Sequence, residues 1–107
     1  QYRKNQLQYI FEWDPTKETT NIRKHKVSFR KAATVFHDPN QLSIYDETHS
    51  NYEERWITLG LDSDGVLRIV VHTFRHMNEN MYKIRIISAR KATSQEREQY
   101  QSKEGIK

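Results

Sequence analysis

A four-residue turn between two apolar runs constrains the fold of this chain more than any other feature. The turn is Asp62-Ser63-Asp64-Gly65, and residues 54–61 before it and 66–75 after it both have the composition of strands. Runs joined by a short turn rich in Asp and Gly form antiparallel β-hairpins. Since residues 66–75 make the most apolar strand of the chain, we predict that this strand is central and that residues 54–61 pair with it.

Two helices are indicated ahead of this hairpin. Asp14 is a good N-cap, and Pro15 follows at the first helical position, where its missing N–H costs nothing; a helix is predicted over residues 15–25. Ser28 can cap a second helix, which is expected to end at Asp38-Pro39-Asn40. The apolar positions of this second helix fall on one face at the spacing i, i+3, i+4 and i+7: Phe29, Ala32, Ala33 and Phe36.

Grouped strands and segregated helices indicate an α+β fold with a mainly antiparallel sheet. The two early helices would cover one face of the sheet through Ile22, Val27, Phe29 and Phe36, leaving the other face partly open for a shallow site. The remaining elements are expected as strands at 8–13, 41–46 and 82–90, loops at 47–53 and 76–81, and a helix at about 94–103.

The composition indicates a single domain with a modest core. The chain has 107 residues, of which 35% are hydrophobic and 30% charged. It has no Cys, so disulfides and thiolate chemistry are excluded. No apolar run approaches the roughly 20 residues of a membrane span, and no apolar signal core follows the polar N-terminal residues. We therefore expect a soluble, cytoplasmic domain over 1–107, with residues 1–8 as a flexible extension.

The charge of the chain favours anionic partners. The net charge is +4 at pH 7, and such a balance speeds encounter with anions. Basic residues cluster at Arg23-Lys24-His25-Lys26, at Arg30-Lys31, and at Arg85, Arg90 and Lys91, whereas acidic residues gather at Asp46-Glu47, Glu53-Glu54, Asp62 and Asp64.

The segment 85–96 combines a strand, two cations and a helix start. Simple alternation puts Ile84, Ile86 and Ser88 on one face and Arg85, Ile87 and Ala89 on the other. Arg90 and Lys91 end the strand, and Thr93-Ser94-Gln95-Glu96 has the pattern of a capping box. Fixed positive charge at this position can hold a phosphate, although an ordinary solvated strand edge has the same pattern.

Several blocks of the chain, in the same order, resemble the BrnT family of bacterial toxins. The resemblance covers roughly residues 9–100. It departs from the family at Lys26, where members commonly have Gly, and at the longer loop 76–82. The blocks are residues 11–17, 21–29, 32–36, 38–39, 54–60, 73–75, 85–93 and 96–100.

This resemblance implies a RelE-like fold and RNA cleavage that needs neither metal nor cofactor. It also implies a partner antitoxin that resembles BrnA and carries a ribbon-helix-helix DNA-binding region. The implied complex contains two toxins and two antitoxins, and operator DNA is contacted only through the antitoxin.

Metal-free RNA cleavage uses the substrate 2′-OH as nucleophile on the adjacent phosphate. Fixed cations stabilise the phosphate charge, and Arg suits this role because its planar fork matches phosphate oxygens. We expect Arg55, Arg75 and Arg90 to clamp the phosphate and His25 or Glu54 to move a proton. Lys24 would add charge, and the further RNA-binding candidates are Arg23, Lys26, Arg85 and Lys91.

Each of these assignments has an alternative, in which Arg55 is an exposed member of a charged strand end after Glu53 and Glu54, and Arg90 only ends its strand. Lys24 and His25 close a helix, where cations are favoured by the helix dipole. Trp13 is expected in the core, and Trp56 either packs, contacts a partner or stacks on a base. His72 and His76 are four apart on a strand and its loop, which does not suit a metal site. A basic module that binds its antitoxin or RNA without catalysis is the alternative function.

Overall fold

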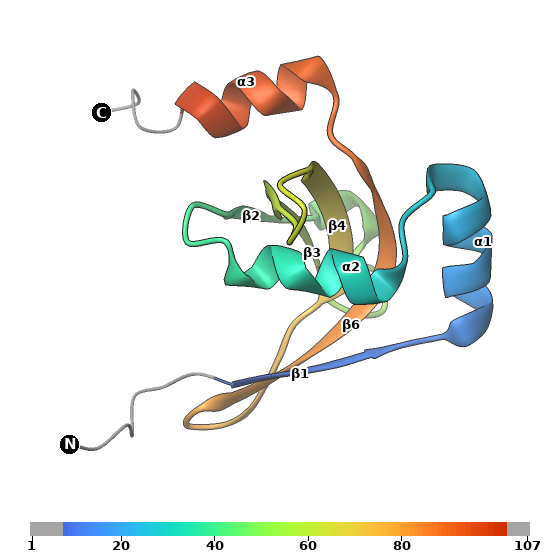
Figure 1. The fold of residues 1–107 in the computed structure, drawn as a ribbon. Helices are drawn as coiled ribbons and strands as arrows, with labels where there is room; N and C mark the ends of the chain where they lie inside the picture. The colour runs from blue at the N-terminus through green and yellow to red at the C-terminus, as the bar shows by residue number, and fades with distance from the viewer. Residues whose placement is uncertain (1–7, 103–107) are drawn as a thin grey trace.

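The computed structural model describes residues 8–102, and these form a six-stranded sheet with three α-helices (Figure 1). The first seven residues, predicted as an extension, lie outside the described residues, whereas Gln8 already belongs to a strand. The elements are β1 (Gln8–Trp13), α1 (Pro15–His25), α2 (Phe29–Ala33), η1 (Thr34–His37), β2 (Leu42–Tyr45), η2 (Glu47–His49), β3 (Arg55–Leu61), β4 (Leu67–Thr73), β5 (Arg75–Asn78), β6 (Met81–Lys91) and α3 (Ser94–Ser102).

The sheet has the strand order β1-β6-β4-β3-β2, and β5 pairs with β6 off this path. All strand pairs are antiparallel except β1 with β6. The predicted hairpin is confirmed as β3–β4, closed by a hydrogen bond from the Gly65 N–H to the Asp62 carbonyl (2.9 Å). Gly65 has a φ of 80°, which a residue without a Cβ adopts at no steric cost. The prediction of an α+β fold with a mainly antiparallel sheet is therefore confirmed.

One face of the sheet is covered by α2 and η1, which run across it in Figure 1. The core on this face joins Phe29 and Phe36 to Ile84 and Ile86 of β6, and Trp13 packs against its edge. Helix α1 makes a different contact, because its buried residue is the polar Asn21. The predicted arrangement, in which both helices cover one face and Ile22 joins the core, is wrong for Ile22, which is 42% exposed.

Asn21 fixes α1 against the sheet through the backbone of β6. Its side-chain amide donates to the Ala89 carbonyl (2.9 Å) and its oxygen accepts from the Ala89 N–H (3.1 Å). A second donation reaches the Val27 carbonyl (3.1 Å), just past the end of α1. At that end Lys26 adopts a left-handed conformation with φ 62°, the position where family members commonly carry Gly.

Strand β6 contains a β-bulge that changes which residues share a face. Val71 pairs with Ser88 but the next residue, His72, pairs with Ile86, so Ile87 is an extra residue in β6. A bulge reverses the alternation beyond it. Ala89 consequently joins Ile84 and Ile86 in the same core, and the predicted alternation through 89 is wrong.

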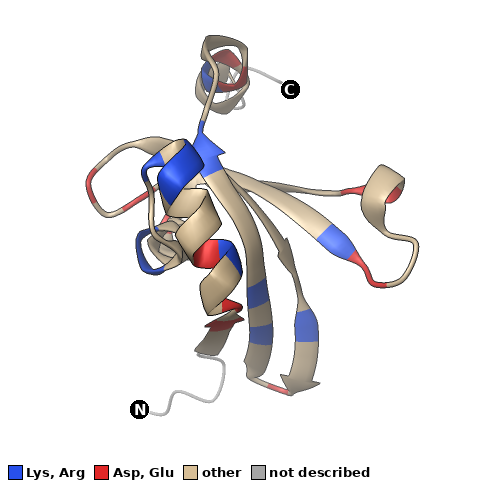
Figure 2. Cartoon of the chain, turned by 90° about the vertical axis from the view of Figure 1, so that its right-hand side faces the viewer, with Lys and Arg blue, Asp and Glu red and all other residues tan. Residues whose placement is uncertain are grey.

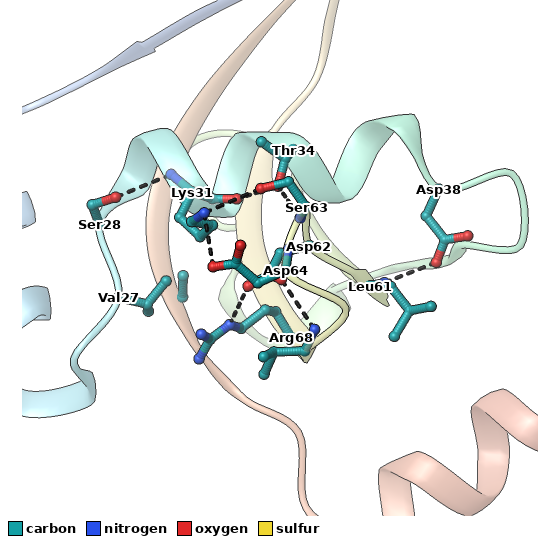
Figure 3. A network of polar contacts seen from close by, with 12 residues as sticks. Val27, Ser28, Lys31, Thr34, Asp38, Leu61, Asp62, Ser63, Asp64 and Arg68 are labelled. Carbon is teal, nitrogen blue, oxygen red and sulfur yellow. Dashed lines mark hydrogen bonds and ion pairs between the residues drawn. The ribbon is translucent and has the colours of Figure 1, made fainter.

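A polar network joins α2 to the β3–β4 turn (Figure 3). The Lys31 ammonium contacts Ser63 (3.1 Å) and Asp64 (2.9 Å), and the Ser63 N–H donates to the Thr34 hydroxyl (2.8 Å). Nearby, Asp38 accepts from the Leu61 N–H (2.8 Å) and from the Tyr100 hydroxyl of α3 (2.6 Å). These bonds hold the second helix and the last helix to the same end of the hairpin.

The predicted loop at 76–81 is wrong, because residues 75–78 form β5 and turn directly into β6. Apolar and polar residues alternate only weakly in this segment, so its sequence does not indicate a strand. The segment becomes a strand because it pairs with β6. In the described part of the chain, no helix has the length and apolar character needed to cross a membrane.

Candidate functional site

The open face of the sheet holds a hollow lined by both cations and carboxylates, which we call the cationic hollow. Its volume is about 290 Å³. Figure 2 shows that basic positions lie on neighbouring strands, with acidic positions in adjoining turns and loops. The lining residues come from β1, the loop before β3, the β4–β5 junction and β6: Glu12, Glu53, Glu54, Thr73, Phe74, Arg75, Lys83 and Arg85.

Strand alternation explains why these cations face away from the core. Ile84 and Ile86 are buried under the helices, so Lys83 and Arg85 project from the opposite face. The register brings further residues to the same place, since Arg75 pairs with Lys83 and Glu12 pairs with Arg85. Arg55 lies opposite Thr73, a residue that lines the hollow.

Glu53 sits between two arginines at this hollow. Its carboxylate accepts a hydrogen bond from Arg85 and lies 3.6 Å from the Nη2 of Arg55. The hydrogen bond from Arg85 lowers the pKa of Glu53 below its usual value, against an opposing effect of burial. One carboxylate therefore lies between two guanidinium groups, each of which can also bind other oxyanions.

Arg55 also keeps an unused donor. Its Nε is buried and has no hydrogen-bond partner among residues 8–102. Buried donors are nearly always paired, because an unpaired one costs roughly 1–3 kcal/mol. The same burial keeps this nitrogen out of reach of a ligand unless the neighbouring side chains move.

The structure brings Glu54, Arg75 and Arg85 together and places Arg55 beside them, linked through Glu53. Glu54 and Arg75 are both exposed, so they are accessible to a ligand from solvent. A carboxylate next to several arginines can accept a proton while the arginines stabilise negative charge.

Lys24 and His25 lie elsewhere. They line a separate hollow between α1 and the bulged part of β6, together with Ile87 and Ser88. Arg23 is also in the last turn of α1 and Lys26 caps it, so all four basic residues lie at the negative end of the helix dipole. The structure does not bring this cluster into the cationic hollow.

Arg90 is also separate from the cationic hollow. It donates to both carboxylate oxygens of Glu96 (2.9 and 2.8 Å), and Glu96 in turn accepts from the Thr93 N–H (2.8 Å), which confirms the predicted capping box. The hydrogen bond from Arg90 lowers the pKa of Glu96 to about 2. Arg90 pairs with Ile69, four residues along β4 from Thr73, or on the order of 13 Å at ~3.3 Å per residue. The structure thus does not bring Arg90 into the cationic hollow with Arg75, and the exposed Lys91 lies next to Arg90.

Sequence reasoning missed Glu12, Glu53, Thr73 and Lys83 as parts of the site. Lys83 lies two residues before Arg85 on the same strand, so alternation alone predicts that both face the same side. Glu12 could not be predicted in this way, because it reaches the site through the parallel pairing of β1 with β6. In the described range 8–102, no group of three His, Cys, Asp or Glu side chains is arranged to hold a metal ion.

Comparison with known proteins agrees with the resemblance stated from the sequence. A family model described as "Ribonuclease toxin, BrnT, of type II toxin-antitoxin system" matches residues 13–96. The chain belongs to the BrnT family. No curated protein matches the chain.

Among solved structures, the chain is similar to the Brucella abortus ribonuclease toxin BrnT, solved at 1.1 Å resolution. The two chains are 21% identical, the match covers 79% of this chain and 96% of the other, and the TM-score is 0.52. This similarity concerns the fold. Membership of the BrnT family identifies the chain as a ribonuclease toxin of a type II toxin–antitoxin system, and most of the cationic hollow lies within the matched residues.

Proposed function

We propose that this BrnT-family protein cleaves RNA at the cationic hollow without a metal ion, by attack of a ribose 2′-OH on the adjacent phosphate. The observation that carries the proposal is the group Arg55, Arg75 and Arg85 beside the carboxylate of Glu54. The unpaired Nε of Arg55 is a further donor, which a phosphate oxygen would reach if the side chains that bury it moved. The proposed target, cellular RNA, would be met in the cytoplasm.

The arginines supply the charge that the reaction needs. The phosphorane-like transition state carries more negative charge on its oxygens than the substrate does, so fixed donors stabilise it preferentially. The substrate phosphate would displace Glu53 from Arg85 and Arg55 and take over its hydrogen bonds. Arg75, which is exposed at the start of β5, would hold the same or the next phosphate.

Glu54 is proposed as the general base. It would take the proton of the 2′-OH as that oxygen forms a bond to phosphorus. The bond from phosphorus to the 5′ oxygen then breaks, and this oxygen receives a proton from solvent. The products are a 2′,3′-cyclic phosphate and a 5′-hydroxyl. Lys24 and His25, the other candidates for this chemistry, would instead contact flanking RNA, together with Arg23 and Lys26.

The test is cleavage of a defined single-stranded RNA by the purified protein in excess EDTA. Arg75→Ala, Arg55→Ala and Glu54→Gln should each lower the cleavage rate about 100-fold. Arg30→Ala is the matched control, because Arg30 is an exposed arginine on α2 away from the hollow, and it should cleave like the wild type. Equal rates for Arg75→Ala and wild type would remove Arg75 from the site.

A second substrate tests the nucleophile. Replacing one 2′-OH by hydrogen at the cleaved nucleotide should block cleavage there while the RNA still binds. Folded wild-type protein that binds RNA or its antitoxin but never cleaves would favour the non-catalytic module, or a need for the ribosome.

The proposed partner is a BrnA-like antitoxin with a ribbon-helix-helix region, in a complex of two toxins and two antitoxins. The open sheet face offers an apolar groove for it, about 270 Å³ in volume, near α3. Ile44 on this groove is 62% exposed, and Ile57 and Val71 lie beside it. An amphipathic antitoxin segment bound here would continue towards the cations with its acidic side chains and exclude RNA from them.

This partner assignment is tested with Ile44→Asp. The change should weaken the antitoxin complex at least 10-fold, because it puts an unpaired charge into an apolar interface, and leave RNA cleavage by free toxin unchanged. Tight antitoxin binding by Ile44→Asp would move the interface to another surface.

A further inference from the structure

The proposed mechanism leaves unused an aromatic pocket on the other side of the sheet from the cationic hollow. Its volume is about 230 Å³, and its walls are mainly rings. Phe36 meets the His72 imidazole edge-on at 4.8 Å, and Phe74 is 39% exposed at the mouth. The lining residues are Tyr9, Phe36, Gln41, Ser43, Trp56, His72 and Phe74.

A chain of hydrogen bonds in this pocket has a fixed direction. The Nδ1 of His72 faces the Thr73 carbonyl (2.9 Å), an acceptor only, so Nδ1 carries the proton. His72 is 2% exposed and its burial lowers its pKa to about 4, so the ring is neutral at pH 7. Its Nε2 must then accept from the Thr58 hydroxyl (2.7 Å).

The same reasoning fixes the donors and acceptors of the side chains that line the pocket. Because the proton of Thr58 is used on His72, the Ser43 hydroxyl must donate to Thr58 (2.7 Å). Ser43 therefore has only acceptor capacity left. Gln41 also has only acceptor capacity left. Its amide nitrogen donates to the Phe36 (3.0 Å) and Asp38 (3.1 Å) carbonyls, and its side-chain oxygen remains as an acceptor. The two non-aromatic polar side chains that line the pocket thus offer acceptors to an occupant.

The pocket and the cationic hollow meet at one residue. Phe74 lines both. Arg55 and Trp56 are consecutive on β3 and project to opposite faces, one towards the cations and the other into the pocket. Among the described strands β5 pairs with β6 and not with β3, so the sheet has an edge at the β4–β5 junction, where Phe74 lies.

We infer that the aromatic pocket binds one unstacked base of the RNA whose phosphate lies in the cationic hollow, and that it favours a base with an amino group on its pairing edge. Single-stranded RNA is commonly read in this way, with bases splayed onto aromatic rings and bonded along their edges. The amino group of adenine, cytosine or guanine has two N–H donors for the two acceptors of the pocket, whereas the pairing edge of uracil has a single donor, N3–H, between two acceptors. This inference rests on the proposed function for the position of the phosphate.

The test measures binding, so it does not depend on cleavage. The probes are short RNAs whose ribose at the cleaved position lacks the 2′-OH, each with one base removed in turn. In wild type, removal of the base that occupies the pocket should weaken binding about 10-fold, and removal of the others should change it less than 3-fold. In Phe74→Ala this base should no longer matter. Ile22→Ala, which truncates an apolar side chain of similar exposure on α1, should keep the 10-fold effect.

Ser43→Ala tests the edge contact without disturbing the rings. It should reduce the preference for an amino-bearing base over uracil at that position, measured as the ratio of the two binding constants, because uracil has one donor on this edge and depends less on a second acceptor. Arg75→Ala should weaken all probes alike and leave the ratio intact. If no removed base affects binding to wild type, or if Phe74→Ala weakens the antitoxin complex but not RNA binding, the pocket does not hold a base and the inference is overturned. Base dependence without any cleavage would instead leave the pocket in place and refute the proposed reaction.

Discussion

Strand β6 carries one arginine–glutamate contact near its C-terminal end and another at its middle, and the two contacts are built differently. Near the C-terminal end Arg90 and Glu96 form a one-to-one pair with two hydrogen bonds, and the same carboxylate caps helix α3 through Thr93. At the middle of the strand Arg85 shares the single carboxylate of Glu53 with Arg55, and the Nε of Arg55 has no partner among the described residues.

The difference separates a structural cation from one that retains capacity for a ligand. Arg90 has its charge matched and its position fixed by a helix start, so a phosphate would have to compete with a good bidentate partner. At Arg85 two guanidinium groups share the one carboxylate of Glu53, and the hollow around them also contains Glu12, Glu54, Arg75 and Lys83. A carboxylate shared between two arginines, rather than the presence of arginine, distinguishes the candidate site.

The largest difference between the two contacts is expected when Arg85 and Arg90 are each replaced by Ala. Arg85→Ala should lower RNA cleavage about 100-fold, because it removes a donor to the transition state, and should change stability little. Arg90→Ala should change cleavage by folded protein less than 3-fold. Rates measured on the same RNA, with the folded fraction checked by circular dichroism, decide the point. Equal losses in both variants would mean that the two contacts act together.

A stability effect is expected at the Arg90 end. Glu96→Gln should lower the free energy of unfolding at pH 7 by about 1–2 kcal/mol, a value reduced because Arg90 is partly solvated. Since the pKa of Glu96 is depressed to about 2, its contribution is present above its ordinary value near 4.5 and is lost as the pH falls from there to about 2. Urea unfolding across this range should show wild type and variant converging at low pH. A constant difference down to pH 2 would contradict the ionic origin.

A smaller effect is expected from the shared carboxylate. Glu53→Gln should tighten RNA binding roughly 3- to 10-fold, because it removes a negative charge that competes with phosphate. Glu12→Gln is the matched control, since Glu12 lines the same hollow but its one ion pair within residues 8–102 is with Lys83, at 3.8 Å. A fall in cleavage of 10-fold or more in Glu53→Gln would instead make Glu53 a member of the reacting group.

The smallest effect is expected at Lys91. Lys91→Ala should weaken RNA binding by less than about 2-fold and reduce the salt dependence of binding by no more than one phosphate contact. Titrations at several salt concentrations measure this slope. A larger reduction would show that bound RNA extends along β6 to the Arg90 end.

The features that sequence predicted correctly have local causes. The Asp62–Gly65 turn, the Asp14-Pro15 helix start and the Thr93–Glu96 capping box each depend on residues within a few positions. The site was predicted only in part, because its composition depends on register. The pairing of β1 with β6 delivers Glu12, and Glu53 looked like one more acid in a polar loop until Arg85 was found to bind it. Glu96, the partner of Arg90, lies only six residues away. That the two side chains point towards each other, and so pair, could nevertheless not be read from the sequence.

The extra residue in β6 also determines how chains of this family should be compared. Arg85 and Arg90 are five positions apart, an odd spacing that would put them on opposite faces of a regular strand, and the bulge at Ile87 puts both on the open face. In a relative whose strand lacks the bulge, the counterpart of Arg90 is expected four residues after that of Arg85, not five. Equivalent cations should therefore be matched by their strand partners and not by their distance along the chain.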